Sequence, residues 1–288
     1  MTKYAREAPE IAEIWSEDVR AIGERGAVLG RELCSCAYPY HALWGLLRVA
    51  GVTGSLRYEE DALAPVLAAR IDNGTRILIA GSADTGTLCA VGRASGNKQP
   101  EVTVVDRCPA PLALIDEFAA ARVTGTRTLC RNLLDLDAEE SFDVVLVNYT
   151  LSYIPPSRRV EVFQRLAGVL VPGGTLICAT KLLSAVKPGH ENMTDDWAVR
   201  AFKKIRDANV GTWLSDDELN SLLRHGASAR ISRRSENPTL IELENYVRRA
   251  GLIPGEELKT ARERALCADG TSAAELDPSI ILSALRTK

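Results

Sequence analysis

Glycines and a carboxylate follow two apolar runs, near residues 80 and 105, and their types and spacing are suited to binding a nucleoside. Gly81 and Gly86 enclose four small or polar residues, so the backbone can approach a ligand closely and the next helix can present its N-terminal N–H groups. Asp106 ends the second run, where its carboxylate can accept hydrogen bonds from both hydroxyls of a ribose. The alternatives are an ordinary turn at the glycines and a helix cap at Asp106 ahead of Pro109. Together the two features favour a nucleoside-binding slot.

Polar and aromatic residues also follow the next two apolar runs. Asn132 and Leu133 come after the third run, where a polar group can bond an exocyclic amine and an apolar one can pack on a purine ring. Asn148 and Tyr149 come after the fourth run, and Tyr153 follows shortly. Tyr149 and Tyr153 are candidate catalytic residues, and packing at the edge of a sheet is the alternative for each.

Aromatic residues are scarce, at 5% of the chain, yet several gather before residue 60. This cluster comprises Tyr38, Tyr40, His41, Trp44 and Tyr58. Helical spacing places Tyr40 and Trp44 on one side of a helix and Tyr38 near His41. One interpretation is that the helix packs onto a sheet. The other is an aromatic lid over a bound ligand, in which His41 or Tyr40 accepts a proton or orients the substrate.

The apolar runs alternate with helix-like segments, which is typical of βαβ units and a parallel sheet. Strands are predicted at 76–81, 101–106, 126–130, 142–148, 175–180 and, late in the chain, 278–285. Helices are predicted among and after the strands at 111–122, 158–170, 195–208, 215–224 and 240–250. Before residue 75 the pattern predicts helices alone, at 11–22, 38–50 and 58–69. Right-handed crossovers then give a doubly wound α/β sheet.

In this order the segments resemble the class I S-adenosylmethionine-dependent methyltransferases over about residues 70–182. The resemblance lies in Ala80-Gly81-x4-Gly86, Val104-Val105-Asp106, Phe142-Asp143-Val144-Val145 and Leu170-Val171-Pro172-Gly173-Gly174-Thr175-Leu176. A nicotinamide-dependent enzyme is not expected to show the Pro-Gly-Gly lead into the fifth strand. The chain departs from the family at Ala83, which replaces the middle glycine of the loop, and at Asn132, where an acid is common.

The resemblance implies a Rossmann-like methyltransferase fold with a mainly parallel seven-stranded sheet, S-adenosylmethionine as cofactor and S-adenosylhomocysteine as product. It implies that the glycine loop lines the methionine moiety, that Asp106 and Arg107 hold the ribose, and that the residues after the fourth strand lie near the sulfonium. Asn132 and Leu133 would face the adenine. The implied cofactor-binding residues are Gly81, Ser82, Ala83, Asp84, Gly86, Asp106, Arg107, Asn132, Leu133, Asn148 and Tyr149. For Asp84, capping of the next helix is an equal alternative.

We interpret residues 70–288 as the catalytic domain that binds S-adenosylmethionine, with a helical cap at 1–69 and a helical insertion at about 181–225. The cap and the insertion are expected to cover the strand ends and to select a small molecule. The predicted function is methyl transfer to an O or N atom of a small metabolite. The alternative is a protein that binds S-adenosylmethionine for other chemistry or for regulation. The candidate catalytic residues are His41, Tyr40, Tyr149 and Tyr153.

The charge balance bears on the partners. The chain has 35 Lys+Arg and 38 Asp+Glu, for a net charge of -3, which disfavours a broad nucleic-acid footprint. The Asn-Pro-Pro-aromatic motif of DNA amino-methylation is also absent after the fourth strand. Basic residues between Arg224 and Arg234 are interpreted as a solvated surface, with an anionic-substrate patch as the alternative. We therefore expect a small-molecule substrate, no nucleic acid and no membrane partner, and we leave a homodimer open.

The seven cysteines are odd in number and scattered, which is typical of reduced thiols in a cytoplasmic protein. The N-terminus carries mixed charges and no apolar segment of a signal peptide. Cys34, Cys36 and His41 lie close in sequence and include good metal ligands. A fourth ligand at a recognised spacing is missing, so we expect no metal site.

Overall fold

The structure is a computed structural model that describes residues 8–36, 39–52, 57–122, 125–137, 141–183, 193–234, 236–259 and 279–287. Seven strands form one sheet in the order β3-β2-β1-β4-β5-β7-β6, and β7 runs antiparallel to both of its neighbours. The strands are β1 Arg76–Ala80, β2 Glu101–Asp106, β3 Thr126–Cys130, β4 Phe142–Asn148, β5 Leu170–Lys181, β6 Leu252–Lys259 and β7 Ser279–Arg286. The predicted doubly wound, mainly parallel, seven-stranded sheet is confirmed.

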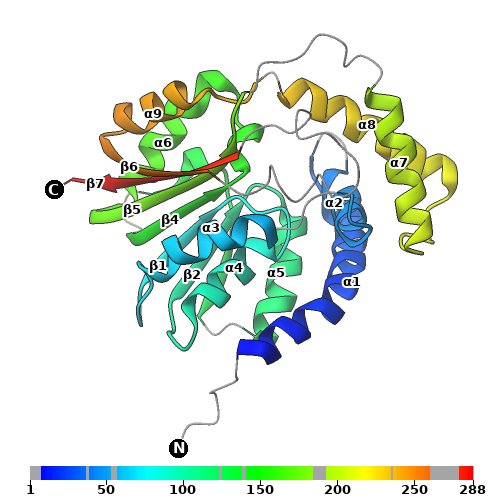
Figure 1. The fold of residues 1–288 in the computed structure, drawn as a ribbon, viewed down its shortest axis with the longest axis horizontal. Helices are drawn as coiled ribbons and strands as arrows, with labels where there is room; N and C mark the ends of the chain where they lie inside the picture. Colours follow the sequence, from blue (N-terminus) through cyan, green and yellow to red (C-terminus); the bar gives the residue numbers. More distant parts are fainter. Residues whose placement is uncertain are drawn as a thin grey trace, which may run out of the picture.

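Helices cover both faces of the sheet, with α3, α4 and α5 on one face and α6 and α9 on the other (Figure 1). The helices are α1 Ala8–Leu33, α2 Tyr40–Val49, α3 Arg57–Ala68, α4 Gly86–Ser95, α5 Pro109–Arg122, α6 Arg159–Gly168, α7 Met193–Asp207, α8 Asp216–Arg234 and α9 Leu240–Arg249. Three single turns of 3-10 helix are η1 Leu133–Asp135, η2 Thr150–Tyr153 and η3 Pro156–Arg158.

The middle residues of the central strands are apolar because both faces of these strands are buried. In β4, Val145 and Val147 pack with α6 and α9, whereas Val144 and Leu146 pack with α3, α4 and α5. This alternation holds the ends of neighbouring parallel strands in register. The residues that follow β1, β2, β3 and β4 are therefore brought to the same edge of the sheet.

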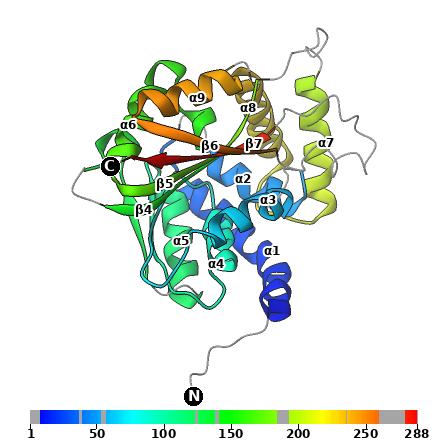
Figure 2. The same ribbon diagram turned by 60° about the vertical axis from the view of Figure 1, so that its left-hand side comes forward.

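The four helices α1, α2, α7 and α8 lie beyond that edge and share a hydrophobic core of their own (Figures 1 and 2). Its buried side chains include Leu46 of α2, Ile205 of α7 and Leu223 of α8. In contrast, α3 packs Leu63 and Leu67 against the sheet beside α4. The boundary of the cap at residue 69 stays a prediction. Helix α3 precedes this boundary in the sequence, although it packs with the sheet.

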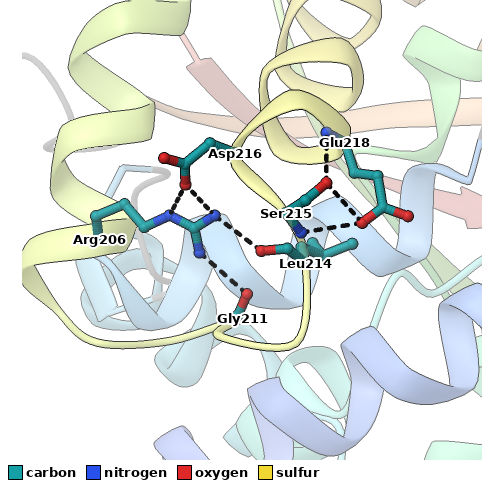
Figure 3. Close-up of polar contacts among 6 residues, drawn as sticks. All are labelled: Arg206, Gly211, Leu214, Ser215, Asp216 and Glu218. Atoms are coloured by element: carbon teal, nitrogen blue, oxygen red, sulfur yellow. Dashed lines mark hydrogen bonds and ion pairs between the residues drawn. The ribbon is translucent and has the colours of Figure 1, made fainter.

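The turn from α7 to α8 is held by Arg206 (Figure 3). Its guanidinium donates from Nε and Nη2 to Oδ1 of Asp216, at 3.0 and 2.7 Å, and also to the backbone carbonyls of Gly211 and Leu214. Ser215 and Glu218 exchange reciprocal hydrogen bonds at the start of α8, which is the pattern of a capping box. These contacts fix the angle between α7 and α8.

Several boundaries differ from the sequence prediction. Strand β6 was not predicted, because Pro254 and Gly255 interrupt its apolar residues. The Pro-Gly-Gly segment lies inside β5, which starts at Leu170 and pairs there with Phe142. Helix α8 continues ten residues past the predicted end at Arg224. Among the described residues, no helix combines the length and the apolar character needed to cross a membrane.

Candidate cofactor and substrate site

Gly81 makes the tight turn that the sequence predicted at the end of β1. Its φ angle is +84°, and its N–H donates to the carbonyl of Val105 at 2.7 Å. A Cβ atom at this position would lie 2.5 Å from both Cγ2 and Oγ1 of Thr150. The Thr150 hydroxyl in turn donates to the carbonyl of Ala80 at 2.9 Å. A glycine is therefore required here both by the backbone conformation and by the close approach of η2.

Asp106 is half-buried at the end of β2, and its carboxylate is oriented by two backbone donors. The N–H of Ser82 donates to Oδ2 at 3.0 Å, and the N–H of Cys108 donates to Oδ1 at 2.8 Å. Burial raises the pKa of Asp106, while these N–H groups act in the opposite direction. Each carboxylate oxygen keeps a lone pair for a further donor. Asp106 can thus accept two hydroxyl hydrogen bonds, as a ribose requires.

Asp84 in the glycine loop binds the cap and the next helix at the same time. Its Oδ2 accepts from Nε1 of Trp44 at 2.7 Å and lies 2.5 Å from Nη1 of Arg48, and its Oδ1 accepts from the N–H of Gly86 at 2.7 Å. The contact with Gly86 is the helix cap that the sequence analysis gave as the alternative role of Asp84. The other two fasten α2 to the cofactor loop, in which Ser82 is buried and Ala83 half-buried.

Asn148 ends β4, and only one of its two polar side-chain atoms has a hydrogen-bond partner among the described residues. Its Nδ2 donates to Oγ1 of Thr87 at 3.0 Å, whereas Oδ1 is buried and has no hydrogen-bond partner among the described residues. Tyr149 follows with a φ of +55° and packs beside the core under α3, α4 and α5. A buried acceptor without a partner is costly, so Asn148 is suited to receive a donor from a ligand at this edge.

The residues expected around the adenine and ribose have mixed environments. Oδ1 of Asn132 accepts from the N–H of Leu134 at 3.1 Å and caps η1. Leu133 is buried in the core on the α6 side, with 9% of its surface exposed. Arg107 is exposed beside Asp106. Contacts of these residues with a cofactor stay predictions.

Tyr40 of α2 and Tyr153 of η2 are in contact, so they join the cap to the segment that follows β4. Their hydroxyls are 2.6 Å apart and their ring centroids 5.3 Å apart. Tyr40 also lies against Trp44, at 5.7 Å between ring centroids, as helical spacing predicted. Of the other members of the aromatic cluster, Tyr38 and the side chain of Tyr58 fall outside the described residues.

His41 contacts Tyr40 edge-on, at 5.1 Å between ring centroids, but its Nδ1 faces sulfur. The distances from Nδ1 to Sγ of Cys34 and Cys36 are 3.3 and 3.9 Å. Burial lowers the pKa of His41 to about 4, so the ring is neutral near pH 7. His41 is thus a neighbour of the tyrosine pair, but its Nδ1 faces the two cysteines and not the tyrosine hydroxyls.

Sequence reasoning missed the residues that act through tertiary contacts. Thr150 and Thr87 bind the predicted site residue Asn148, and Arg48 binds Asp84, yet each stands in a sequence context that carries no signal for that contact. The basic segment near the end of α8 shows Arg224 and His225 exposed, with Nδ1 of His225 at 2.8 Å from the carbonyl of Ser221. The side chains beyond residue 229 in this helix fall outside the described residues.

Comparisons with known proteins place the sheet part of the chain among the methyltransferases. Residues 78–174 match the family model described as a methyltransferase domain. The carboxy-S-adenosyl-L-methionine synthase of Ectopseudomonas mendocina is 33% identical over 101 residues, which cover 33% of this chain and 40% of that protein. The match therefore spans about two fifths of the length of the first curated relatives.

Two solved structures share the fold. An O-methyltransferase family protein from Burkholderia thailandensis has a TM-score of 0.53 at 17% identity, covering 86% of this chain and 60% of that one. The [4+2]-cyclase SpnF has a TM-score of 0.51 at 15% identity, covering 81% and 83% of the two chains. The cytoplasmic location and the lack of nucleic-acid binding stay predictions, and the homodimer stays open as in the sequence analysis.

Proposed function

The chain carries a class I S-adenosylmethionine-dependent methyltransferase domain, and on this premise we propose that it transfers a methyl group to an O or N atom of a small molecule. The observation that carries the proposal is the carboxylate of Asp106. It is fixed at the end of β2 by the N–H groups of Ser82 and Cys108 and retains acceptor capacity for a ribose.

The residues around Asp106 suit the rest of the cofactor. Gly81 lets the backbone approach the methionine moiety, and the unpartnered Oδ1 of Asn148 offers an acceptor close to the end of β4. When bound, S-adenosylmethionine supplies an activated methyl group on its sulfonium. The task of the chain is then to align an acceptor with that methyl group and to exclude water.

We assign the acceptor side to the tyrosine pair between the cap and the sheet. Tyr40 and Tyr153 present two hydroxyls at one point, where they can hold the acceptor or take its proton. Tyr149 is the second candidate, because it directly follows Asn148. His41 is the weaker candidate for a base, since its Nδ1 faces two sulfur atoms and its ring is a poor proton acceptor at neutral pH.

Calorimetry with S-adenosylhomocysteine tests the cofactor site. We expect the wild type to bind it and Asp106→Ala to bind roughly 100-fold more weakly, because two charge-assisted hydrogen bonds are lost. The matched control is Asp116→Ala, since Asp116 is exposed on α5 and contacts the hydroxyl of Thr128. Binding of NADH in place of S-adenosylhomocysteine would refute the assignment.

A labelled methyl group tests the reaction. Incubation with methyl-labelled S-adenosylmethionine and a panel of small acceptors should release S-adenosylhomocysteine and label one acceptor. Tyr40→Phe and Tyr153→Phe are then expected to lower kcat about 10- to 100-fold and to leave the affinity for S-adenosylhomocysteine unchanged. Full turnover in both variants, measured on that acceptor, would remove the tyrosines from the catalytic assignment. His41→Ala gives the same test of the histidine.

A second candidate function is chemistry that uses S-adenosylmethionine without methyl transfer. Two kinds of similar protein favour it. The first curated relatives are named carboxy-S-adenosyl-L-methionine synthases, and one solved structure with this fold is named a [4+2]-cyclase. The label distinguishes the two candidates. A product that keeps both the methyl group and the rest of the cofactor supports the second function and excludes the first.

A further inference from the structure

Three cysteines and a histidine from two distant parts of the chain converge at one point. Cys34 and Cys36 follow α1, His41 is in the first turn of α2, and Cys108 is in the loop after β2. Their ligand atoms, three Sγ and an imidazole nitrogen, all lie within 4.8 Å of one another. We propose that these residues bind a zinc ion that joins the cap to the sheet domain. The evidence for this metal site does not depend on the proposed transferase activity.

The spacing of the four groups suits tetrahedral coordination. In a tetrahedron, zinc bonds of about 2.3 Å to sulfur and about 2.0 Å to nitrogen place neighbouring ligand atoms roughly 3.5 to 3.8 Å apart. In the structure, Nδ1 of His41 lies 3.3 Å from Sγ of Cys34 and 3.9 Å from Sγ of Cys36. Three cysteines and one histidine form a complete set of four protein ligands, which is typical of structural zinc rather than of a catalytic metal.

The surroundings of the ligands also fit a bound cation. Cys108 is fully buried and His41 is 8% exposed, so neither is an accidental surface contact. Backbone N–H groups of Cys36 and His41 point at Sγ of Cys34, and those of Ser35 and Ala110 point at Sγ of Cys108. Such donors orient thiolate ligands around a metal. Three thiolates and Zn²⁺ leave one negative charge, which Arg107 nearby can offset.

The packing of α1 on α2 holds the ligands together. A Cβ atom on Gly30 would lie 2.2 Å from the backbone N of Ala42 and 2.5 Å from the carbonyl carbon of His41. Glycine at residue 30 therefore allows the end of α1 to approach the start of α2. This close approach brings Cys34 beside His41. The sequence prediction of no metal site rested on a missing fourth ligand, and the fold supplies Cys108 from the other side of the interface.

A disulfide is the competing use of these thiols. It would join two of the sulfur atoms and leave the third sulfur and the imidazole without a role. Cys34 and Cys36 are separated by one residue, which makes a bond between them strained. A metal uses all four groups at once and matches the sulfur and imidazole donors that zinc prefers.

The metal content of the full-length protein tests the proposal. The chain is expressed in medium supplemented with zinc, freed of loosely bound metal by gel filtration, and analysed by mass spectrometry of the elements. We expect about one zinc per chain in the wild type. Cys34→Ala, Cys36→Ala, His41→Ala and Cys108→Ala should each lose most of it. Cys130→Ala and His225→Ala are the controls and should keep it, because these residues lie outside the cluster.

Cobalt gives a second readout that requires no variant. Zinc is removed from the wild type with a chelator and replaced by Co²⁺, whose visible spectrum reports coordination geometry and whose near-ultraviolet bands report thiolate ligands. We expect a tetrahedral spectrum with sulfur-to-cobalt bands. The proposal is overturned by a wild type without zinc and without this spectrum, by iron as the resident metal, or by a disulfide within the cluster in the non-reduced protein. Zinc retained in full by Cys108→Ala would overturn the four-ligand assignment.

Discussion

The backbone N–H of Cys108 donates to Oδ1 of Asp106 over 2.8 Å, so the proposed zinc ligand and the proposed ribose ligand share one short segment of backbone. Asp106 is the last residue of β2, and Cys108 precedes α5. A metal that holds the sulfur of Cys108 therefore also holds the donor that orients the carboxylate. The two proposed sites are coupled through this hydrogen bond.

Cys108→Ser tests the coupling, because it keeps the backbone N–H and removes a metal ligand. We expect the dissociation constant of S-adenosylhomocysteine to rise about fivefold or more, within the usual range for coupled sites. Cys130→Ser is the control, since Cys130 is exposed and is not part of the cluster, and its affinity should equal that of the wild type. Equal affinities of both variants by calorimetry would show that the sites are independent.

Gly81→Ala tests the contact between the cofactor loop and η2. The variant combines a strained positive φ with the collision of Cβ and Thr150, so we expect a loss of about 3 kcal/mol in the free energy of unfolding. Gly74→Ala is the matched control. It has a φ of +76° but nothing within 4 Å of the added Cβ, so it should lose only about 1 kcal/mol. Equal losses in urea unfolding would mean that Thr150 moves aside freely.

The sheet was predictable because its central strands are buried on both faces. Runs such as Val144 to Val147 are apolar throughout and mostly β-branched, and a contiguous sequence signal of this kind needs no knowledge of distant residues. Strand β6 lacks that signal. It lies at the edge of the sheet, contains Pro254 and Gly255, and leaves Ile253 53% exposed. Strand β6 is extended because it pairs with β7, and that pairing is not visible in the sequence.

The same distinction applies to the site. Gly81, Asp106 and Asn148 were predictable as a group because each ends a strand or directly follows one, and parallel strands end at one edge. Cys108 belongs to the same loop as Asp106, but its partners lie before residue 42. No spacing rule connects those segments, because their proximity depends on how the cap docks on the sheet. The sequence therefore predicted the cofactor slot and not the metal cluster.

Asp84→Asn tests the ion pair that fastens α2 to the cofactor loop. The side chains of Arg48 and Asp84 are 18% and 13% exposed, so removing one charge leaves the other buried, and we expect a loss of about 3 kcal/mol in urea unfolding. Glu117→Gln is the control. It breaks a bidentate pair with Arg25, but both side chains are nearly half exposed, at 46% and 47%, and the loss should stay below about 1 kcal/mol. Similar losses in the free energy of unfolding of the two variants would show that burial does not strengthen the pair of Arg48 and Asp84.

Arg206→Lys tests whether the planar guanidinium holds the turn from α7 to α8. Lysine keeps the charge near Asp216 but cannot also reach the carbonyls of Gly211 and Leu214, so we expect a loss of about 2 kcal/mol in the free energy of unfolding. Arg248→Lys is the control, because its pair with Glu244 is an exposed contact within one helix and should contribute less than about 0.5 kcal/mol. If Arg206→Lys unfolds at the wild-type urea concentration, the charge alone holds the turn, and the carbonyl contacts add nothing to its stability.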